Sequence, residues 1–279
     1  MSSKKVIDYY NQCHTDYRIF WNIHKNYSIH FGFYDKAHKK HDDAVINMNR
    51  ILAKISKITS KDKILDAGCG IGGSSIWLAK NFGTNVIGIN IHKMQVEIAK
   101  KLARKNGVDN LVKFFVKDFM DTNFSPNSFD VVWGLESICH GENKKVFLTK
   151  AKRVLKNNGR IIIADFFLKK ENLTNNEKRD MNKWLYGWAL PNLSSVTEFQ
   201  KYLEELGFKN IEFRDITKNV MPSSRYMYLL AIIGYPVYKF LEYFNIRTKM
   251  QIENIISAYY QHKTLKKDLW TYGIFYAEK

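Results

Sequence analysis

Residues 59–168 alternate between short apolar runs and amphipathic segments. The apolar runs have the length of buried strands and are KILDAG (63–68), NVIGIN (85–90), VKFFVKD (112–118), SFDVVWGL (128–135) and RIIIADFFL (160–168). The segments between them have helical spacing and are SSIWLAKNF (74–82), KMQVEIAKKLARKNG (93–107) and NKKVFLTKAKRVLK (143–156). Strand–helix alternation with short connections predicts an α/β fold, with a parallel sheet covered by helices on both faces.

The flanking regions are less regular. Residues 4–22 and 37–58 have helical spacing, and the aromatic segment 26–35 between them predicts an ordered loop. After Leu168 we expect helices over Asn175–Trp188 and Val196–Leu206, a strand over 209–216, a helical region over 222–261 that breaks near Gly234, Pro236 and Asn245, and a last strand over 268–279. We therefore expect one domain over 1–279, divided into an N-terminal helical lid (1–58), a core (59–168, 196–216 and 266–279) and two cap insertions (169–195 and 217–265).

Composition narrows the class of protein. With 45% hydrophobic and 25% charged residues, the chain has the profile of an ordinary soluble globular protein, which excludes collagen-like, low-complexity and disordered classes. The cysteines (Cys13, Cys69 and Cys139) show no CxxC spacing, so we expect neither a disulfide framework nor a metal site. The N-terminal residues show no signal-peptide pattern. The most apolar segment, Tyr226–Phe244, carries Pro236 and two charged residues, which predicts a buried or membrane-touching helix in a cytoplasmic protein.

The net charge of +17 has two interpretations. A strongly basic chain is typical of proteins that bind nucleic acid, an anionic membrane or an anionic ligand. However, 35 of the 44 basic residues are lysines scattered in ones and twos, beside many Asn and Ile residues, which also fits a compositional bias of the proteome. The charge alone does not decide between a functional and a compositional origin.

A glycine-rich loop follows the first predicted strand and opens a helix. Its sequence is Asp66-Ala-Gly68-Cys-Gly70-Ile-Gly72-Gly73. Glycines allow a ligand to approach the backbone closely, and a helix N-terminus offers free N–H groups to an anion. The acid before the first glycine would repel a dinucleotide pyrophosphate but attract an ammonium group. The position about 20 residues on, where dinucleotide-binding folds carry an acid for the ribose, is Asn90.

The loop and the segments after it resemble class I S-adenosylmethionine-dependent methyltransferases. DAGCGIGGSS resembles their first motif, GINIHKMQ the second-strand segment of cyclopropane fatty acid synthases, and VVWGLESICH the fourth-strand segment of tocopherol and sterol methyltransferases. The opening YY…DY…FW…HFG resembles the lid of sterol and geranyl diphosphate methyltransferases, and LWTYGIFYAEK their closing antiparallel strand. The resemblance implies a Rossmann-like, seven-stranded, mostly parallel sheet whose last strand is antiparallel.

The resemblance also implies S-adenosylmethionine as the cofactor. Its carboxylate would meet the loop N–H groups, its ammonium Asp66, its ribose Gln95, and its adenine Asp118 and Phe119. The expected cofactor-binding residues are Asp66, Gly68, Gly70, Gly72, Asn90, Ile91, Gln95, Asp118, Phe119 and Leu135. Since these residues follow successive strands of one parallel sheet, we expect them at one edge of it.

Methyl transfer from a sulfonium requires alignment, exclusion of water and, for most acceptors, removal of a proton. His140 is the first candidate base and Glu136 the second, while Asp165 would orient His140 or act as the base itself. His140 could instead cap the next helix. A carbon acceptor would call for a carboxylate and aromatic faces. The residues expected to contact the acceptor, or to offer such faces, are Tyr9, Tyr10, Trp21, Tyr27, His30, Tyr34 and Trp184, although His30 could be structural and the cap aromatics could form only the cap's own core.

The sequence therefore favours a methyltransferase that acts on carbon or oxygen of a small apolar or amphipathic acceptor, such as a lipid, terpenoid or natural product. Methylation of a small polar amine, a nucleic-acid-binding protein and a nicotinamide-dependent dehydrogenase remain alternatives. Nucleic acid is not the expected partner, because the (Asp/Asn)-Pro-Pro-(Tyr/Phe) motif of base-modifying enzymes is missing after the fourth predicted strand. Cys139 lacks the Pro-Cys or Thr-Cys context of a cytosine methyltransferase nucleophile, and Glu136 is not adjacent to His140, as it would be in a cyclopropane synthase. Transient membrane contact is an open possibility, and the oligomeric state is not predicted.

Overall fold

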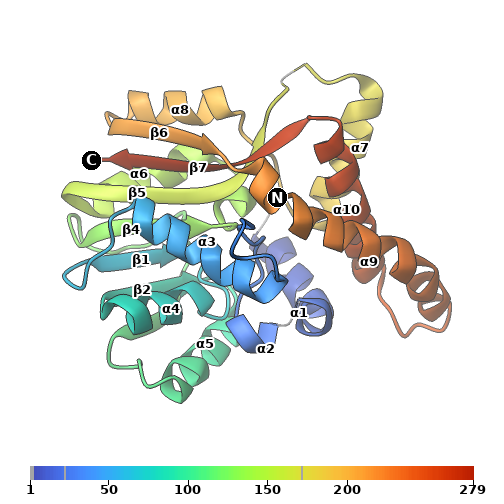
Figure 1. Ribbon diagram of the computed structural model, residues 1–279, viewed down its shortest axis with the longest axis horizontal. Helices are drawn as coiled ribbons and strands as arrows, with labels where there is room; N and C mark the ends of the chain where they lie inside the picture. The colour runs from blue at the N-terminus through green and yellow to red at the C-terminus, as the bar shows by residue number, and fades with distance from the viewer. Residues whose placement is uncertain (1–2, 22, 171) are drawn as a thin grey trace.

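A computed structural model describes residues 3–21, 23–170 and 172–279. Its centre is a seven-stranded sheet in the order β3-β2-β1-β4-β5-β7-β6 (Figure 1). The strands are β1 (Lys63–Ala67), β2 (Asn85–Asn90), β3 (Val112–Val116), β4 (Phe129–Leu135), β5 (Leu155–Leu168), β6 (Lys209–Asp215) and β7 (Trp270–Glu278). The strands β3, β2, β1, β4 and β5 pair in parallel, whereas β7 pairs antiparallel with both β5 and β6. The predicted seven-stranded sheet with an antiparallel last strand is confirmed.

The helices surround this sheet and extend beyond one of its ends. They are α1 (Ser3–Phe20), α2 (Ile23–Asn26), α3 (His41–Ile55), α4 (Gly73–Phe82), α5 (Lys93–Lys105), the 3₁₀ turn η1 (Ile138–His140), α6 (Lys144–Val154), α7 (Asn175–Gly187), α8 (Val196–Glu205), α9 (Thr217–Tyr243) and α10 (Lys249–Lys266). Local sequence explains several of their starts. The Asn143 side chain caps α6, and Thr174 and Thr248 form capping boxes with Glu177 and Gln251.

Both faces of the sheet are buried, as expected for a mostly parallel sheet. Side chains alternate between two hydrophobic clusters along β5, where Ile162 and Phe166 lie in one cluster and Ile161 and Phe167 lie in the other. The first cluster also receives side chains from α1, α7, α9 and α10, and this places the cap helices on the same side of the sheet as the N-terminal segment. Figure 1 shows α1, α7, α9 and α10 grouped beyond the ends of the parallel strands.

The structure corrects three expected boundaries. The helix predicted over 4–22 ends at Phe20, and the short α2 follows it. The helical segment predicted over 143–156 ends at Val154, and β5 begins at Leu155, before the strand expected from residue 160. Its pairing with β4 shifts register between Phe129 and Val131, and Asn158 has a positive φ of 61°. The helix expected to break near Gly234 and Pro236 is continuous as α9.

The prolines of α9 explain why the expected break does not occur. Pro222 and Pro236 both lie on the exposed side of the helix. The carbonyl that each proline leaves without an N–H partner therefore faces solvent, while the opposite side packs on α10. The chain reverses instead at residues 244–248, where Asn245 has a positive φ. Within the described ranges, no helix is both long and apolar enough to cross a membrane.

Candidate active site

The glycine-rich loop lies between β1 and α4, and each of its glycines meets a different constraint. Gly68 has φ of 88°, and a Cβ there would lie 2.4 Å from Cβ of Ser137. Gly72 has φ of 91°, and a Cβ there would lie 2.6 Å from the ring of Phe114. Gly70 has φ of 54°, and a Cβ there would meet no atom within 4 Å. Gly68 and Gly72 are therefore required by packing, whereas Gly70 faces open space.

Asp66 stands one residue before the end of β1, with only 3% of its surface exposed. Its Oδ2 accepts a hydrogen bond of 2.6 Å from the Ser75 hydroxyl in α4. Desolvation raises the pKa of Asp66 to about 6, although Ser75 opposes this shift. A cationic ligand group beside this carboxyl would stabilise its charged form and offset the cost of burial.

The end of β2 fixes the loop through amide side chains. The Asn90 Nδ2 group donates to the Gly70 carbonyl at 3.2 Å and to Gln95 Oε1 at 2.7 Å. His92 caps α5 by accepting a hydrogen bond from the Gln95 backbone. Asn90 thus orients both the loop and Gln95. Because the Gln95 oxygen accepts from Asn90, the Nε2 group of Gln95 is the part of this side chain that could donate to a ligand.

Asp118 and Phe119 follow β3 on another side of the same cavity. Asp118 Oδ1 accepts a 2.8 Å hydrogen bond from the Met120 backbone, which closes a tight turn. The Phe119 ring packs edge-on against Phe147 of α6, with their centroids 5.5 Å apart. These contacts hold one carboxylate and one flat apolar wall at the edge of the cavity.

These residues border one cavity of about 510 Å³, within the usual size range of small-molecule sites. The expected cofactor residues that line it are Asp66, Gly68, Gly70, Asn90, Ile91, Gln95, Asp118, Phe119 and Leu135. Gly72 does not line it, because it caps α4 and packs on Phe114. The structure brings together nine of the ten residues expected to bind the cofactor.

Glu136 follows β4 directly and has a positive φ of 46°, which is uncommon for a residue with a side chain. This conformation is held by the cavity wall, since Glu136 Oε1 accepts hydrogen bonds from the Phe31 backbone at 2.6 Å and from the Tyr272 hydroxyl at 2.7 Å. Desolvation raises the pKa of Glu136 to about 8, against the opposing effect of these two donors. Strained backbone and a shifted carboxyl at one cavity are typical of functional sites.

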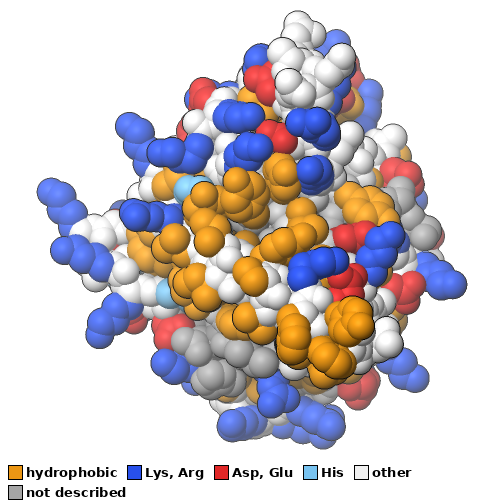
Figure 2. Space-filling model, turned by 90° about the vertical axis from the view of Figure 1, so that its right-hand side faces the viewer, with side chains coloured by type: hydrophobic (Ala, Val, Ile, Leu, Met, Phe, Trp, Pro, Cys, Tyr) orange, Lys and Arg blue, Asp and Glu red, His pale blue; other side chains and the backbone are white. Residues whose placement is uncertain are grey.

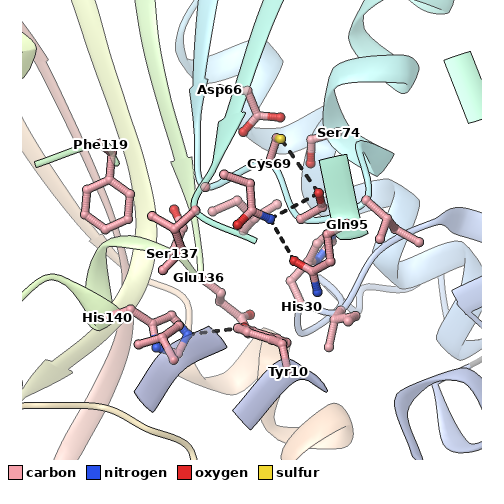
Figure 3. Close-up of a pocket in the computed structure, with 18 of the residues that line it drawn as sticks. Tyr10, His30, Asp66, Cys69, Ser74, Gln95, Phe119, Glu136, Ser137 and His140 are labelled. Carbon is pink, nitrogen blue, oxygen red and sulfur yellow. Dashed lines mark hydrogen bonds between the residues drawn. The ribbon is translucent and has the colours of Figure 1, made fainter. Parts of the chain in front are cut away.

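His140 ends η1 and faces the same cavity. Its Nδ1 lies 3.2 Å from the Ala189 carbonyl. Its Nε2 lies 3.2 Å from the Tyr10 hydroxyl (Figure 3). Because a carbonyl can only accept, Nδ1 carries the proton and Nε2 is left as the acceptor in the neutral ring. Burial lowers the pKa of His140 to about 4. His140 does not cap the following helix, since Asn143 does so.

Asp165 does not reach His140, contrary to the expected orienting role. It is 2% exposed, and it accepts hydrogen bonds from the Cys139 backbone at 2.8 Å and the Phe166 backbone at 2.9 Å. Lys144 donates to the Cys139 and Asn192 carbonyls. Asp165 and Lys144 therefore position the η1 turn from behind, while the Ala189 carbonyl orients the ring of His140.

A smaller chamber of about 40 Å³ lies behind the main cavity. Its lining is mainly aromatic and apolar and consists of Tyr9, Tyr10, Tyr17, Trp21, Ile29, Phe31, Glu136, Cys139, His140, Phe166, Trp188, Leu190 and Met227. Tyr10, Ile29, Glu136 and His140 line both spaces. The expected acceptor residues Tyr9, Tyr10 and Trp21 thus border this inner chamber.

Trp184 and Tyr34 line neither space. Trp184 is fully buried in the core, where its ring lies 4.6 Å from Trp270 and 5.5 Å from Phe166. It faces inward because the apolar side of α7 packs on α10 and β7. The Tyr34 hydroxyl pairs with His41 at the start of α3. Of the expected aromatic residues, these two support the fold and do not line the inner chamber.

The segment between α2 and α3 covers the main cavity beside the start of α4. A Cβ on Gly73 would lie 2.3 Å from the Ser28 hydroxyl and 2.4 Å from the Tyr27 carbonyl, so this segment lies directly on the start of α4. His30 in the same segment is 5% exposed, and its Nδ1 lies 3.0 Å from the Phe31 carbonyl. Its Nε2 is buried without a hydrogen-bond partner among the described residues and borders the cavity.

The sequence did not single out several residues of this site. They are Ser28, Phe31, Ser137, Lys144, Phe166, Trp188, Ala189, Leu190, Met227 and Tyr272. Most are ordinary apolar residues whose neighbours are distant in the chain, so no local spacing could identify them. Ser137 had a local signal, because it lies between Glu136 and His140 and a Cβ at Gly68 would collide with it.

The edge where β1, β2, β3 and β4 end is where open α/β sheets bind their ligands. The glycine-rich loop and Asp66 border the cavity at this edge, and Gln95 and Asp118 follow the next two strands. This arrangement is that of the class of S-adenosylmethionine-dependent methyltransferases. Residues 58–207 match the family described as methyltransferase domain, more than half of the chain, and the chain belongs to this family. Its cofactor is S-adenosylmethionine.

Individual relatives cover most of the chain. It is 30% identical over 236 residues to a chloroplastic tocopherol O-methyltransferase of Arabidopsis thaliana, covering 78% of this chain and 67% of the relative. It is 29% identical over 220 residues to a sarcosine/dimethylglycine N-methyltransferase of Aphanothece halophytica, covering 78% of both. A geranyl diphosphate C-methyltransferase of Streptomyces coelicolor A3(2) superposes with a TM-score of 0.76 at 18% identity, over 99% of this chain and 96% of that one. The last likeness shows the fold alone.

The residues present fit the cofactor. Gly70 provides a left-handed backbone position that faces open space, where a side chain would occupy the cavity. The Asp66 carboxyl would hold the ammonium group, Gln95 the ribose, and Asp118 with Phe119 the adenine. When bound, the cofactor supplies a methyl group on a sulfonium. The loop around Ser28 and His30 covers the cavity and would keep water from it.

Proposed function

We propose that this enzyme methylates a carbon or oxygen atom of a small apolar or amphipathic acceptor, such as a lipid, a terpenoid or a natural product, and that the whole chain works as one methyltransferase domain. The observation that carries the proposal is the inner chamber, whose walls are mainly aromatic and which shares Tyr10, Glu136 and His140 with the cofactor cavity. The chamber, about 40 Å³ here, would have to widen to admit an acceptor, which would then have its apolar part against Trp21, Phe166 and Trp188 and its reacting atom beside the shared residues.

His140 and Glu136 divide the proton chemistry. His140 is held in the neutral form with Nε2 as the acceptor, so it can take the proton of a hydroxyl that replaces Tyr10 as its partner. Glu136 has its pKa raised to about 8, close to the operating pH at which general acids and bases are most effective. For a carbon acceptor, positive charge that develops beside Glu136 would favour its ionised form, and this carboxylate and the rings of Tyr10 and Phe31 would stabilise that charge.

A second candidate is methylation of a small polar amine, which the similarity to the sarcosine/dimethylglycine N-methyltransferase favours. An amino-acid acceptor carries a carboxylate that requires a cationic partner. Among the described residues that line the inner chamber, none is Lys or Arg. This composition supports the apolar acceptor over the amine.

The test has two parts. Calorimetry with S-adenosylhomocysteine first measures cofactor binding. Methyl transfer from labelled S-adenosylmethionine is then measured for a prenylated phenol, an isoprenoid alkene and dimethylglycine. We expect labelled product from one of the first two acceptors and none from dimethylglycine. Labelling of dimethylglycine alone would replace the proposal by methylation of an amine.

The size of the chamber and the chemistry of the proposed acceptor also decide whether nucleic acid or a membrane is proposed as a partner. Nucleic acid is not proposed, because the chamber is small and lies behind the cofactor cavity. An apolar acceptor with a hydrocarbon chain is dissolved in membranes, so we propose transient contact with a membrane. The cytoplasmic location expected from the sequence stays a prediction.

A further inference from the structure

The helix α9 exposes a row of large hydrophobic side chains. Tyr226, Leu229, Ile233, Val237, Phe240 and Phe244 follow one another at intervals of three or four residues and therefore lie on one face, here called the α9 apolar face. Ile233 is 74% exposed, Phe240 64% and Phe244 55%. Figure 2 shows the end of the molecule where α9 and α10 lie, with hydrophobic side chains gathered across its centre. Contiguous exposed apolar patches of this kind mark contact surfaces.

The opposite face of α9 already serves the core. Val220, Ala231 and Tyr238 are buried there, and α9 packs along α10. The helix is thus apolar on two sides, one facing the protein and one facing solvent. Folding requires only the first of these sides, so the second needs an occupant outside the chain's own core.

The charges around the α9 apolar face indicate what this occupant is. Residues 217–249 contain the basic residues Lys218, Arg225, Lys239, Arg247 and Lys249, and Glu242 as the only acid. Arg247 pairs with Asp16, Lys239 with Glu242 and Lys249 with Glu253. Lys218 and Arg225 are exposed and lie along the N-terminal half of α9. An apolar face beside exposed cations fits an anionic lipid surface, where the apolar side chains enter the headgroup boundary.

A second copy of the chain fits less well. A symmetric dimer would place the same surface on itself, so Lys218 and Arg225 of the two copies would lie across one contact. With a net charge of +17 on each chain, such a pair would also repel at longer range. An anionic bilayer has neither disadvantage.

A cavity behind the α9 apolar face lies between this surface and the inner chamber. It has a volume of about 130 Å³, lies between α1, α9 and α10, and includes the exposed Ile233 and Phe20 in its wall. Tyr17, Trp21 and Met227 line both this cavity and the inner chamber. These three side chains are therefore the partition between an apolar opening at the α9 surface and the site of methyl transfer.

We propose that the α9 apolar face docks in the interface of an anionic lipid bilayer, and that the cavity behind it takes up the hydrocarbon chain of the acceptor from that bilayer. The second part rests on the proposed function, since it assumes an apolar acceptor. In this docking the side chains of the α9 apolar face enter the headgroup boundary, and the helix lies along the surface of the bilayer.

The test measures co-sedimentation of the full chain with vesicles of phosphatidylglycerol and phosphatidylcholine, and with vesicles of phosphatidylcholine alone. We expect binding to the anionic vesicles that weakens with salt, and weaker binding to the neutral ones. The variant Ile233→Ser/Phe240→Ser should lower the partition coefficient about tenfold or more, because two exposed apolar side chains lose their lipid contact. Lys218→Gln/Arg225→Gln should lower binding to the anionic vesicles only.

The matched control is Phe115→Ser/Val146→Ser, which removes two exposed apolar side chains (42% and 39% exposed) from β3 and α6. It should bind vesicles as the wild type does. An equal loss in this control, or full binding by Ile233→Ser/Phe240→Ser, would overturn the proposal, as would a wild-type chain that stays in solution. A dimer that dissociates only in Ile233→Ser/Phe240→Ser, without vesicle binding, would identify a second copy as the occupant. Calorimetry with S-adenosylhomocysteine checks that every variant keeps its cofactor site, and methyl transfer to the acceptors named above, measured without vesicles, separates failure of docking from failure of the proposed function.

Discussion

The two halves of the active site are built in different ways. The cofactor half consists of the ends of β1, β2 and β3, and its key contacts join residues close in the chain, such as Asn90 with Gln95 and Asp66 with Ser75. The acceptor half consists of side chains from distant elements, as in the contacts of Glu136 with Phe31 and with Tyr272. The first half is defined by backbone conformation at strand ends, and the second by packing of the cap. A substitution in the cap can therefore alter the acceptor half while the contacts of the cofactor half stay in place.

The largest expected effect breaks the cofactor half. Gly70→Val should abolish measurable binding of S-adenosylhomocysteine, because the side chain would enter the cavity from a backbone with positive φ. The matched control is Gly83→Val. Gly83 also has a positive φ (66°), and a Cβ there would meet no atom within 4 Å, but it lies at the other end of α4. Calorimetry and thermal unfolding of both variants check the prediction. Equal loss of binding in Gly83→Val would show that strain, and not the cavity, is responsible.

The next effect separates the two halves. His140→Ala should leave cofactor binding unchanged and slow methyl transfer by roughly 10²-fold or more, because the acceptor loses its proton-accepting Nε2. Tyr10→Phe is the companion variant, since it removes the hydroxyl partner and keeps the imidazole. Single-turnover rates over pH measure both. Because burial lowers the pKa of His140 to about 4, His140 stays neutral when the pH is lowered to 6.5. The wild-type rate should therefore not fall at that pH through protonation of His140. Unchanged turnover in His140→Ala would remove this residue from the mechanism.

A smaller effect concerns Glu136, whose side chain lines both the cofactor cavity and the inner chamber. The pKa of Glu136 is raised from 4.5 to about 8 in the folded chain, so the folded state binds the proton more tightly than the unfolded state. Its contribution to stability is complete below about pH 4.5 and is lost as the pH rises towards 8. Glu136→Gln keeps the acceptor oxygen for Phe31 and Tyr272 and removes this titration. Its Tm relative to the wild type should rise by about 2–4 °C or more between pH 5 and pH 8. A constant difference across this range would contradict the raised pKa.

The same division explains how far the sequence could predict the molecule. Strand periodicity is a local signal, and it predicted the parallel part of the sheet. The loop Gly68–Gly73 and the segments after it are local too, and the family resemblance that they carry implied ten cofactor residues, of which nine line the cavity. Gly72 was expected in the cavity but does not line it, because it packs against Phe114, a residue of another strand. The acceptor half has no local signal. The sequence placed Asp165 beside His140, whereas the structure gives Ala189 that position, and an alanine carbonyl carries no mark in a sequence.

The smallest effect tests which aromatic residues of the cap belong to the acceptor half. Trp184 and Trp188 are a matched pair on one helical turn, each with a buried indole N–H that has no partner among the described residues. Trp188 lines the inner chamber and Trp184 does not. Trp184→Phe should lower Tm by no more than about 5 °C, since the cavity left by the smaller ring is offset by removal of an unpaired donor, and should leave the KM of the acceptor unchanged. Trp188→Phe should raise that KM several-fold at a similar Tm. If Trp184→Phe instead changed the KM as strongly as Trp188→Phe, the chamber would extend into what the structure shows as the core of the cap.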